Sequence, residues 1–326
     1  MINRRSFLKG LASGAAAVPL APEALALTWR GAEAERPEVM RPVVDTHMHV
    51  WSDQPASFPF AHPFDPAFKA PACKATVDML LDDMDANGVT HCILVQVIFH
   101  GWDNRYVAHC AKLHPKRLKA HGLIDPTDPE VAKKLEYWVK EQGLSGMRFS
   151  PIYYKGKDDW LNARSSDALW KRAEELGAVF NFFISTPQLP KLEDMVKRFS
   201  GVQVVIDHLA QADLKVEDPL PELKKLLALT RYPNVWVKVS ELTSVSRSGK
   251  YPFRDAHPWV KRVYDAFGPD RLLWGTGYPG SARGHYQRPT LKEELALIRE
   301  EIPFFTAADK DKILGGNAAR LWKFDG

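Results

Sequence analysis

Two histidines stand two positions apart in a short apolar stretch near the start of the chain. In Val43-Val44-Asp45-Thr46-His47-Met48-His49-Val50 the β-branched residues predict a strand. Side chains two apart on a strand point the same way, so His47 and His49 should project together. Neutral imidazole is a common zinc ligand, so the pair could form half of a metal site. Two histidines at this spacing can also arise by chance and satisfy only local hydrogen bonds.

Apolar segments of this kind alternate with helical patterns along the whole chain. The predicted strands cover residues 43–50, 91–97, 119–125, 146–150, 178–185, 202–209, 235–241 and 272–278. Such alternation implies β-α-β units and a parallel sheet. Eight units within about 280 residues predict a (β/α)8 TIM barrel forming one domain over residues 43–326. A doubly wound open sheet is the alternative, but no G-x-G-x-x-G turn opens the first helix.

The chemistry of such a barrel lies at the C-terminal ends of its strands. The polar residues predicted at or near that end are His47, His49, Gln96, His121, Asp125, Arg148, Asp207, His208, Lys238, Ser240, Glu241 and Tyr278. Three of these histidines and one arginine at the same end exceed what chance would place there. Arg148 could clamp a substrate carboxylate, which the planar guanidinium matches in a bidentate way. It could equally form a structural ion pair across the barrel mouth.

Seven motifs occur in a recognisable order. They are D-T-H-M-H at 45–49, Gln96 after an apolar strand, Asp103-Asn104, G-M-R-F at 146–149, I-D-H-L at 206–209, W-G-T-G-Y-P at 274–279 and G-N-A-A-R-L-W at 316–322. Together they resemble the amidohydrolase-related family, in the branch that includes 2-pyrone-4,6-dicarboxylate lactonase and sugar lactonases. The resemblance covers nearly all of the chain after its N-terminal segment. It implies a TIM barrel that hydrolyses a lactone or a related ester, although some relatives are decarboxylases.

The resemblance also implies roles for individual residues. His47, His49 and His208 match metal ligands, with zinc or manganese as the metal. In metal-free members His47 and His49 would polarise the substrate carbonyl instead. His208 could also serve as the general base or acid. Gln96, Arg148 and Tyr278 match substrate-binding positions, with Arg148 on a carboxylate. Asn317 and Arg320 match a closing motif that packs and caps.

One departure from the family pattern affects the chemistry. The family usually carries an aspartate at the end of the last strand, where it activates the attacking water, and this chain has Gly277. Glycine can neither bind a metal nor accept a proton. Glu241, at the end of the neighbouring strand, is the best replacement by position, and Asp255 on the following loop is a weaker one. Glu241 could also be only a solvated loop carboxylate.

The first residues predict an export signal. Arg4-Arg5-Ser6-Phe7-Leu8-Lys9 is a twin-arginine pattern, followed by a mildly apolar run and the small-residue site Ala24-Leu25-Ala26. We expect residues 1–26 to direct export to the periplasm. The apolar run is too short to span a bilayer, so no stable membrane insertion is expected.

Composition excludes some partners and leaves others open. The chain has 326 residues, 26% of them charged, with a net charge of +4 and no basic block interleaved with aromatic residues, so nucleic acid is not an expected partner. Aromatic residues in loops (Trp51, Trp102, Tyr153, Tyr154 and Trp160) suggest a ring-shaped or sugar-like small molecule. A homo-oligomer stays open.

The sequence therefore predicts an exported hydrolase that opens a lactone or similar carboxylated ring ester with activated water. Because Gly277 replaces the usual aspartate, two alternatives remain. One is a non-hydrolytic binding protein on the same barrel, and the other is a decarboxylase-type lyase. A divalent metal and metal-free catalysis are both open at this stage.

Overall fold

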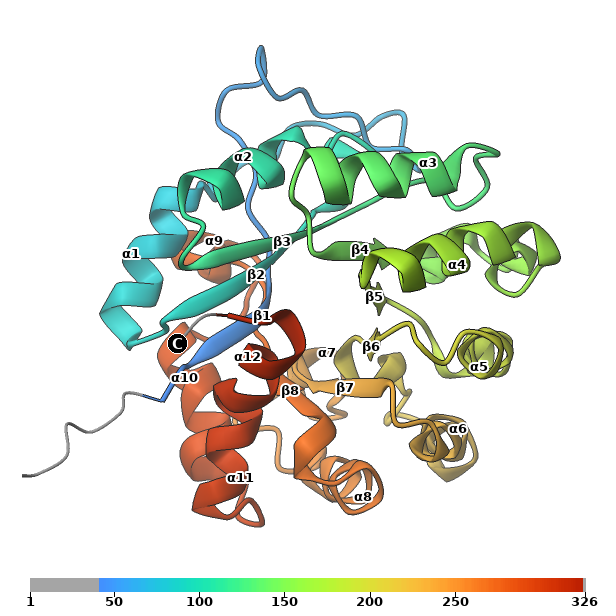
Figure 1. The fold of residues 1–326 in the computed structure, drawn as a ribbon. Helices are drawn as coiled ribbons and strands as arrows, with labels where there is room; N and C mark the ends of the chain where they lie inside the picture. The colour runs from blue at the N-terminus through green and yellow to red at the C-terminus, as the bar shows by residue number, and fades with distance from the viewer. Residues whose placement is uncertain (1–40, 325–326) are drawn as a thin grey trace, which may run out of the picture. The chain divides into compact units, whose positions relative to one another are not determined.

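The structure is a computed structural model that describes residues 41–324. Eight parallel strands pair in chain order and form a nearly closed barrel, which confirms the predicted TIM barrel (Figure 1). The strands are β1 (Val44–Met48), β2 (His91–Val95), β3 (Leu118–Gly122), β4 (Gly146–Phe149), β5 (Val179–Phe182), β6 (Val204–Ile206), β7 (Val235–Val239) and β8 (Leu272–Trp274). A parallel bridge between Met48 and Gly277 links β1 to the segment after β8.

Helices surround the strands, as the alternating pattern predicts. They are α1 (Val77–Asn87), α2 (Arg105–Leu113), α3 (Val131–Glu136), α4 (Asp167–Leu176), α5 (Leu189–Arg198), α6 (Leu220–Leu227), α7 (Leu242–Val245), α8 (His257–Phe267), α9 (Gly280–His285), α10 (Leu291–Ala296), α11 (Ala307–Asp311) and α12 (Asn317–Trp322). The short helices α7 and α9 follow β7 and β8 directly and were not predicted. Among residues 41–324, no helix has both the length and the apolar character needed to cross a bilayer. The predicted export signal, residues 1–26, lies outside the described residues.

Local sequence explains where the helices begin and end. The Thr76 hydroxyl accepts a hydrogen bond from the backbone N–H of Met79 and caps α1, while Gly88 ends that helix with a left-handed φ of 69°. The apolar face of each helix packs on the outside of the sheet. A second apolar cluster, which includes Val44, Leu273 and Trp322, fills the N-terminal end of the barrel.

A bulge in β1 determines which of its side chains face the barrel interior. Val44 pairs with His91 and Asp45 with Cys92, but Met48 pairs with Leu94, so β1 carries one extra residue between these pairs. A bulge of this kind re-aims the following side chains. Val44 therefore joins the interior cluster, and both His47 and His49 still lie inside the barrel at the opposite end.

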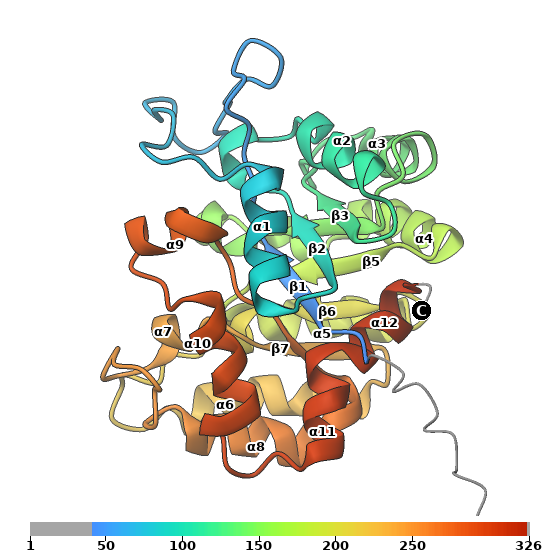
Figure 2. The same cartoon turned by 90° about the vertical axis from the view of Figure 1, so that its left-hand side faces the viewer.

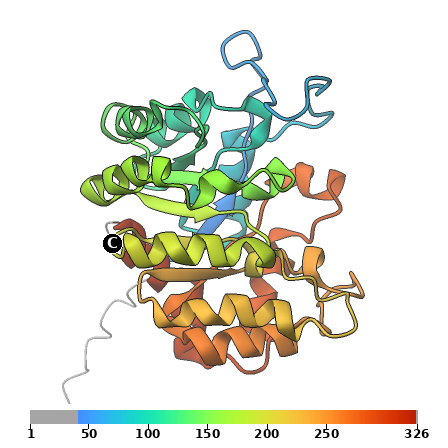
Figure 3. The same cartoon turned by 90° about the vertical axis from the view of Figure 1, so that its right-hand side faces the viewer.

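Different segments of the chain cover the two ends of the barrel. Figure 2 shows α7 and α9 at the C-terminal end of the strands and α12 at the other end. The view from the opposite side places the long loop of residues 51–75, in blue, at the same end as the orange α9 segment (Figure 3). That loop begins shortly after the histidine pair, and Phe64 in it lines a pocket at this end.

The fold gives a direct test of the closing motif. Asn317 is fully buried, and its side-chain Nδ2 donates to the carbonyls of Pro269 (2.7 Å) and Leu272 (2.8 Å). Asn317→Ala should lower the free energy of unfolding by about 2–4 kcal/mol, because two carbonyls lose their donor. Lys171→Ala, at an exposed position of α4, is the control and should change it much less. Equal denaturation midpoints for both variants would contradict the proposed role of Asn317.

Candidate active site

The predicted site residues His47, His49, His208 and Glu241 meet at the C-terminal end of the barrel. The Nε2 atoms of His47 and His49 lie 3.3 Å apart, and the ring centroids of His47 and His208 are 4.5 Å apart. His208 Nε2 is 3.7 Å from Glu241 Oε1. One potential ligand atom from each of His47, His208 and Glu241 lies within 4.8 Å of the other two. By distance alone, these three residues could bind one metal ion.

The Glu241 carboxylate lies beside the glycine that replaces the usual aspartate. A Cβ atom built at Gly277 would be 3.6 Å from Glu241 Oε1. Gly277 has φ +132°, a conformation that strains any residue with a side chain. An aspartate introduced here would therefore meet both a strained backbone and a like charge. Arg288 holds the other oxygen of Glu241, with its Nη1 3.2 Å from Oε2.

A buried ionic cluster lies directly beneath the histidines. Asp207 Oδ1 is 3.0 Å from Lys238 Nζ, and Asp207 Oδ2 is 3.2 Å from Arg148 Nε. Asp207 and Lys238 are fully buried and Arg148 is nearly so. Lys238 Nζ also contacts the Thr46 carbonyl (2.8 Å) and His47 Nδ1 (3.1 Å). His47 is thus in contact with a group of charged side chains that is shielded from solvent.

Unusual backbone conformations aim His208 and Glu241 into the site. Residues 208–211 all have φ between 47° and 56°, and Glu241 has φ 51°. Non-glycine residues rarely adopt this left-handed region, and clusters of them occur where function requires it. Ser240 Oγ lies 2.8 Å from His208 Nδ1 and fixes the ring, leaving His208 Nε2 directed at Glu241.

Burial and neighbouring charges set the protonation of these groups. Burial lowers the pKa of His47 well below its usual value, lowers that of His49 to about 3 and lowers that of His208. Burial alone would raise the pKa of Glu241, but His208 and Arg288 outweigh it and the pKa is lowered. Imidazoles with lowered pKa values are neutral at neutral pH, and a carboxyl with a lowered pKa is ionised there. The site therefore combines a carboxylate base with neutral imidazoles.

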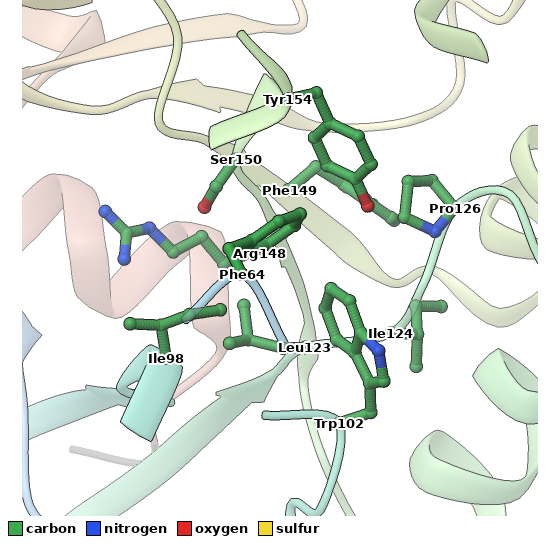
Figure 4. Close-up of a pocket in the computed structure, with 10 residues that line it drawn as sticks. All are labelled: Phe64, Ile98, Trp102, Leu123, Ile124, Pro126, Arg148, Phe149, Ser150 and Tyr154. Carbon is green, nitrogen blue, oxygen red and sulfur yellow. The ribbon is translucent and has the colours of Figure 1, made fainter. Parts of the chain in front are cut away.

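Arg148 connects this cluster to a small, mainly apolar pocket at the same end of the barrel. Its lining residues are Phe64, Ile98, Trp102, Leu123, Ile124, Pro126, Arg148, Phe149, Ser150 and Tyr154 (Figure 4). Arg148 uses only Nε on Asp207, and the structure gives its two terminal nitrogens no hydrogen bond within residues 41–324. The Ser150 hydroxyl, also buried, has no partner in that range either. Apolar side chains and unpaired hydrogen-bond donors therefore lie side by side here, as they do in many ligand-binding sites.

The other predicted residues have more mixed surroundings. Tyr278 lies against His49, with ring centroids 5.4 Å apart. Gln96 is fully buried, but its Nε2 already donates to the Asp103 carbonyl (2.7 Å), and only its Oε1 has no partner in the described chain. His121 lies deeper in the barrel, where its Nε2 accepts from Trp322 Nε1 (2.8 Å). The Asp255 carboxylate lies outside the site and accepts hydrogen bonds within its own loop, from the Ser246 hydroxyl and from backbone N–H groups.

Three charged residues of the site, Asp207, Lys238 and Arg288, were not assigned a role from sequence. Lys238 is the one charged residue in the otherwise apolar strand V-W-V-K-V, and it is fully buried. A charged residue inside such a strand could have been recognised from sequence as a candidate functional residue. Arg288 follows α9 in a loop and has no local pattern that marks it. Only the folded chain brings it to Glu241.

Comparisons with known proteins agree with this architecture. The model of the Amidohydrolase family (Amidohydro_2) matches residues 44–324. The chain is 28% identical over 313 residues to a 2-pyrone-4,6-dicarboxylate hydrolase of Comamonas testosteroni, covering 91% of this chain and 95% of the relative. It is 26% identical to a 4-sulfomuconolactone hydrolase of Rhizobium radiobacter, covering 85% and 89%.

A solved structure shows the same fold. An amidohydrolase from Burkholderia multivorans, solved with bound zinc, superposes with a TM-score of 0.69 at 23% identity, covering 87% of this chain and all of the other. The family match spans almost all of the described residues, and the two relatives named above are hydrolases. The chain therefore belongs to the amidohydrolase family and is a lactonase-like enzyme of the hydrolase type.

Proposed function

We propose that this protein opens a carboxylated lactone ring by attack of a water molecule that Glu241 activates. The observation that carries the proposal is the Glu241 carboxylate itself. It stands 3.7 Å from His208 Nε2 and 3.6 Å from where a side chain at position 277 would begin. The carboxylate missing from the last strand is thus replaced, in nearly the same place, from the end of β7.

Arg148 would fix the substrate. Its two terminal nitrogens have no partner among the described residues, and a guanidinium edge binds a carboxylate through two parallel hydrogen bonds. The Phe183 ring lies on one face of the guanidinium, 4.6 Å from its carbon, and limits its movement. The apolar walls of the pocket would then pack against the substrate ring and exclude water from it.

The histidines and Glu241 would carry out the ring opening. Glu241 accepts a proton from water, and the water oxygen bonds to the lactone carbonyl carbon. The His208 ring, whose Nδ1 accepts from the Ser240 hydroxyl, donates from Nε2 to the carbonyl oxygen as it becomes an oxyanion. When the intermediate collapses, the ring C–O bond breaks. The proton held by Glu241 passes to the departing ring oxygen, so the product is a ring-opened hydroxy acid or its keto form.

The residues around His47 do not suit a metal ion. A metal-bound imidazole normally donates its remote N–H to a carboxylate or carbonyl. His49 fits, because its Nδ1 lies 2.8 Å from the Val95 carbonyl. His47 does not, because its Nδ1 lies 3.1 Å from the Lys238 amino group, which is a donor. The steps above accordingly use only side chains of this chain.

Replacing the proposed base should separate it from the other candidate carboxylate. Glu241→Gln removes the proton acceptor and keeps the shape, so kcat on a responsive lactone should fall by about a hundredfold or more. Asp255→Asn is the matched control and should leave kcat unchanged, because Asp255 serves its loop. Turnover would be followed on a panel of carboxylated lactones and aryl carboxylates. Release of CO₂ without ring opening would favour the lyase alternative, and wild-type kcat in Glu241→Gln would remove Glu241 from the mechanism.

Substrate charge should reveal the role of Arg148. Arg148→Lys keeps the charge beside Asp207 but loses the two-nitrogen fork, so KM for a carboxylated lactone should rise about tenfold or more. KM for an uncharged lactone of the same ring should not change. Arg172→Lys, on the outer helix α4, serves as the control. An equal rise in both KM values would assign Arg148 to structure alone.

We further propose that the enzyme works in the periplasm. The support is the order of the twin-arginine pattern, the apolar run and the small-residue site within residues 1–26. Replacing Arg4 and Arg5 together by lysine should leave the protein in the cytoplasmic fraction, as measured by cell fractionation and immunoblotting. Arg30→Lys is the control and should be exported normally. Unaltered export of the double variant would contradict the twin-arginine route.

A further inference from the structure

The strongest unassigned group is the fully buried amine of Lys238, at the centre of the barrel. We propose that the Lys238 ammonium is the resident cation of this site, and that it holds His47 in the tautomer that excludes a metal ion. The inference concerns the cation of the site rather than its substrate. It therefore stands or falls separately from the lactonase activity.

The hydrogen-bond donors and acceptors around Lys238 match in number. An ammonium carries three N–H donors and no acceptor. Three acceptors surround Lys238 Nζ at hydrogen-bond distance, namely the Thr46 carbonyl at 2.8 Å, Asp207 Oδ1 at 3.0 Å and His47 Nδ1 at 3.1 Å. The side chain is fully buried, so water does not compete for these donors. One donor for each acceptor makes His47 Nδ1 an acceptor.

That assignment fixes both rings of the histidine pair. If His47 Nδ1 accepts from Lys238, the single ring proton of neutral His47 lies on Nε2. This Nε2–H points to His49 Nε2, which is 3.3 Å away. His49 in turn donates from Nδ1 to the Val95 carbonyl at 2.8 Å, which leaves its Nε2 free to accept. One proton placement therefore satisfies every contact of the pair without an ion.

A metal ion on His47 Nε2 would need the opposite placement. The ring proton would move to Nδ1 and face the Lys238 donor at 3.1 Å. The nearest acceptor that could receive it is Asp207 Oδ1 at 3.5 Å, but Lys238 and Asn181 already donate to that oxygen. Lys238 thus occupies the carboxylate that would otherwise support a metal-bound His47.

The charge balance points the same way. The cations in and beside this cluster are Lys238, Arg148, Arg288 and Arg283. The anions are Asp207, Glu241 and Asp45, which accepts from the His47 backbone N–H. With neutral imidazoles the group already carries an excess of one positive charge. A divalent ion would raise that excess to three in a site where most of these charges are buried, and such an accumulation is strongly unfavourable.

The tautomer of His47 can be measured directly. In protein labelled with ¹⁵N-histidine, long-range ¹H–¹⁵N spectra distinguish Nε2–H from Nδ1–H rings, and His47→Asn identifies the signals of His47. We expect Nε2–H on His47 and Nδ1–H on His49 in the intact wild-type protein. A wild-type His47 with its proton on Nδ1 would overturn the proposal.

Zinc affinity provides the second measurement. Lys238→Met removes the ammonium and leaves Asp207 neutralised by Arg148 but free to accept from His47 Nδ1–H. Zinc binding by calorimetry should therefore tighten about 10- to 100-fold relative to wild type, the usual effect of a supporting partner. Lys191→Met, whose amine pairs with Asp158 and Asp159 outside the site, should bind zinc like wild type.

Two results would contradict the proposal. One is zinc that copurifies with the wild-type protein at one ion per chain and survives dialysis. The other is equal zinc affinity in wild type and a folded Lys238→Met variant. If Lys238→Met fails to fold, the wild-type tautomer and the wild-type zinc content still decide the question. Neither readout uses turnover, so loss of the proposed lactonase activity would leave both interpretable.

Discussion

The buried carboxylate of Asp207 is the interaction on which the rest of the site depends. It has no contact with solvent, and it receives Lys238 and Asn181 on one oxygen and Arg148 on the other. Burying one carboxylate is costly, and removing a partner from a buried pair typically costs about 3–5 kcal/mol. Its partners are therefore fixed in place. The carboxylate orients an arginine toward the pocket and an amine toward His47, while the next residue along the chain is His208.

The barrel also supports backbone that would be unstable elsewhere. Each left-handed non-glycine residue costs on the order of 1–3 kcal/mol, and residues 208–211 and Glu241 are all of this kind. They follow β6 and β7 directly, where strand pairing with both neighbours holds the chain before each turn. The strain directs His208 and Glu241 inward rather than into the loops. Rigid strands followed by strained turns thus bring two side chains from separate β-α units within 3.7 Å.

Much of this could be predicted from the sequence, because local patterns carry it. Apolar runs predicted all eight strands, and the His-x-His spacing placed the pair in the barrel interior. The β1 bulge, by contrast, depends on pairing with β2 and has no signal in the chain. Arg288 and Asp207 act through contacts with residues far away in sequence, so their partners appear only in the folded chain. Asp255 shows the opposite error, since a carboxylate near the site by position is satisfied by its own loop.

The proximity of Glu241 and Gly277 shows why a residue pattern alone predicts this chemistry incompletely. Strand ends in a barrel converge, so one point above the histidines can be reached from two neighbouring strands. A family pattern records only which strand usually supplies the carboxylate. Here the absence of a side chain at Gly277 leaves room for the Glu241 carboxylate, and an ion pair with Arg288 holds that carboxylate in place. A missing motif residue is therefore evidence of lost function only after the space it would occupy has been inspected.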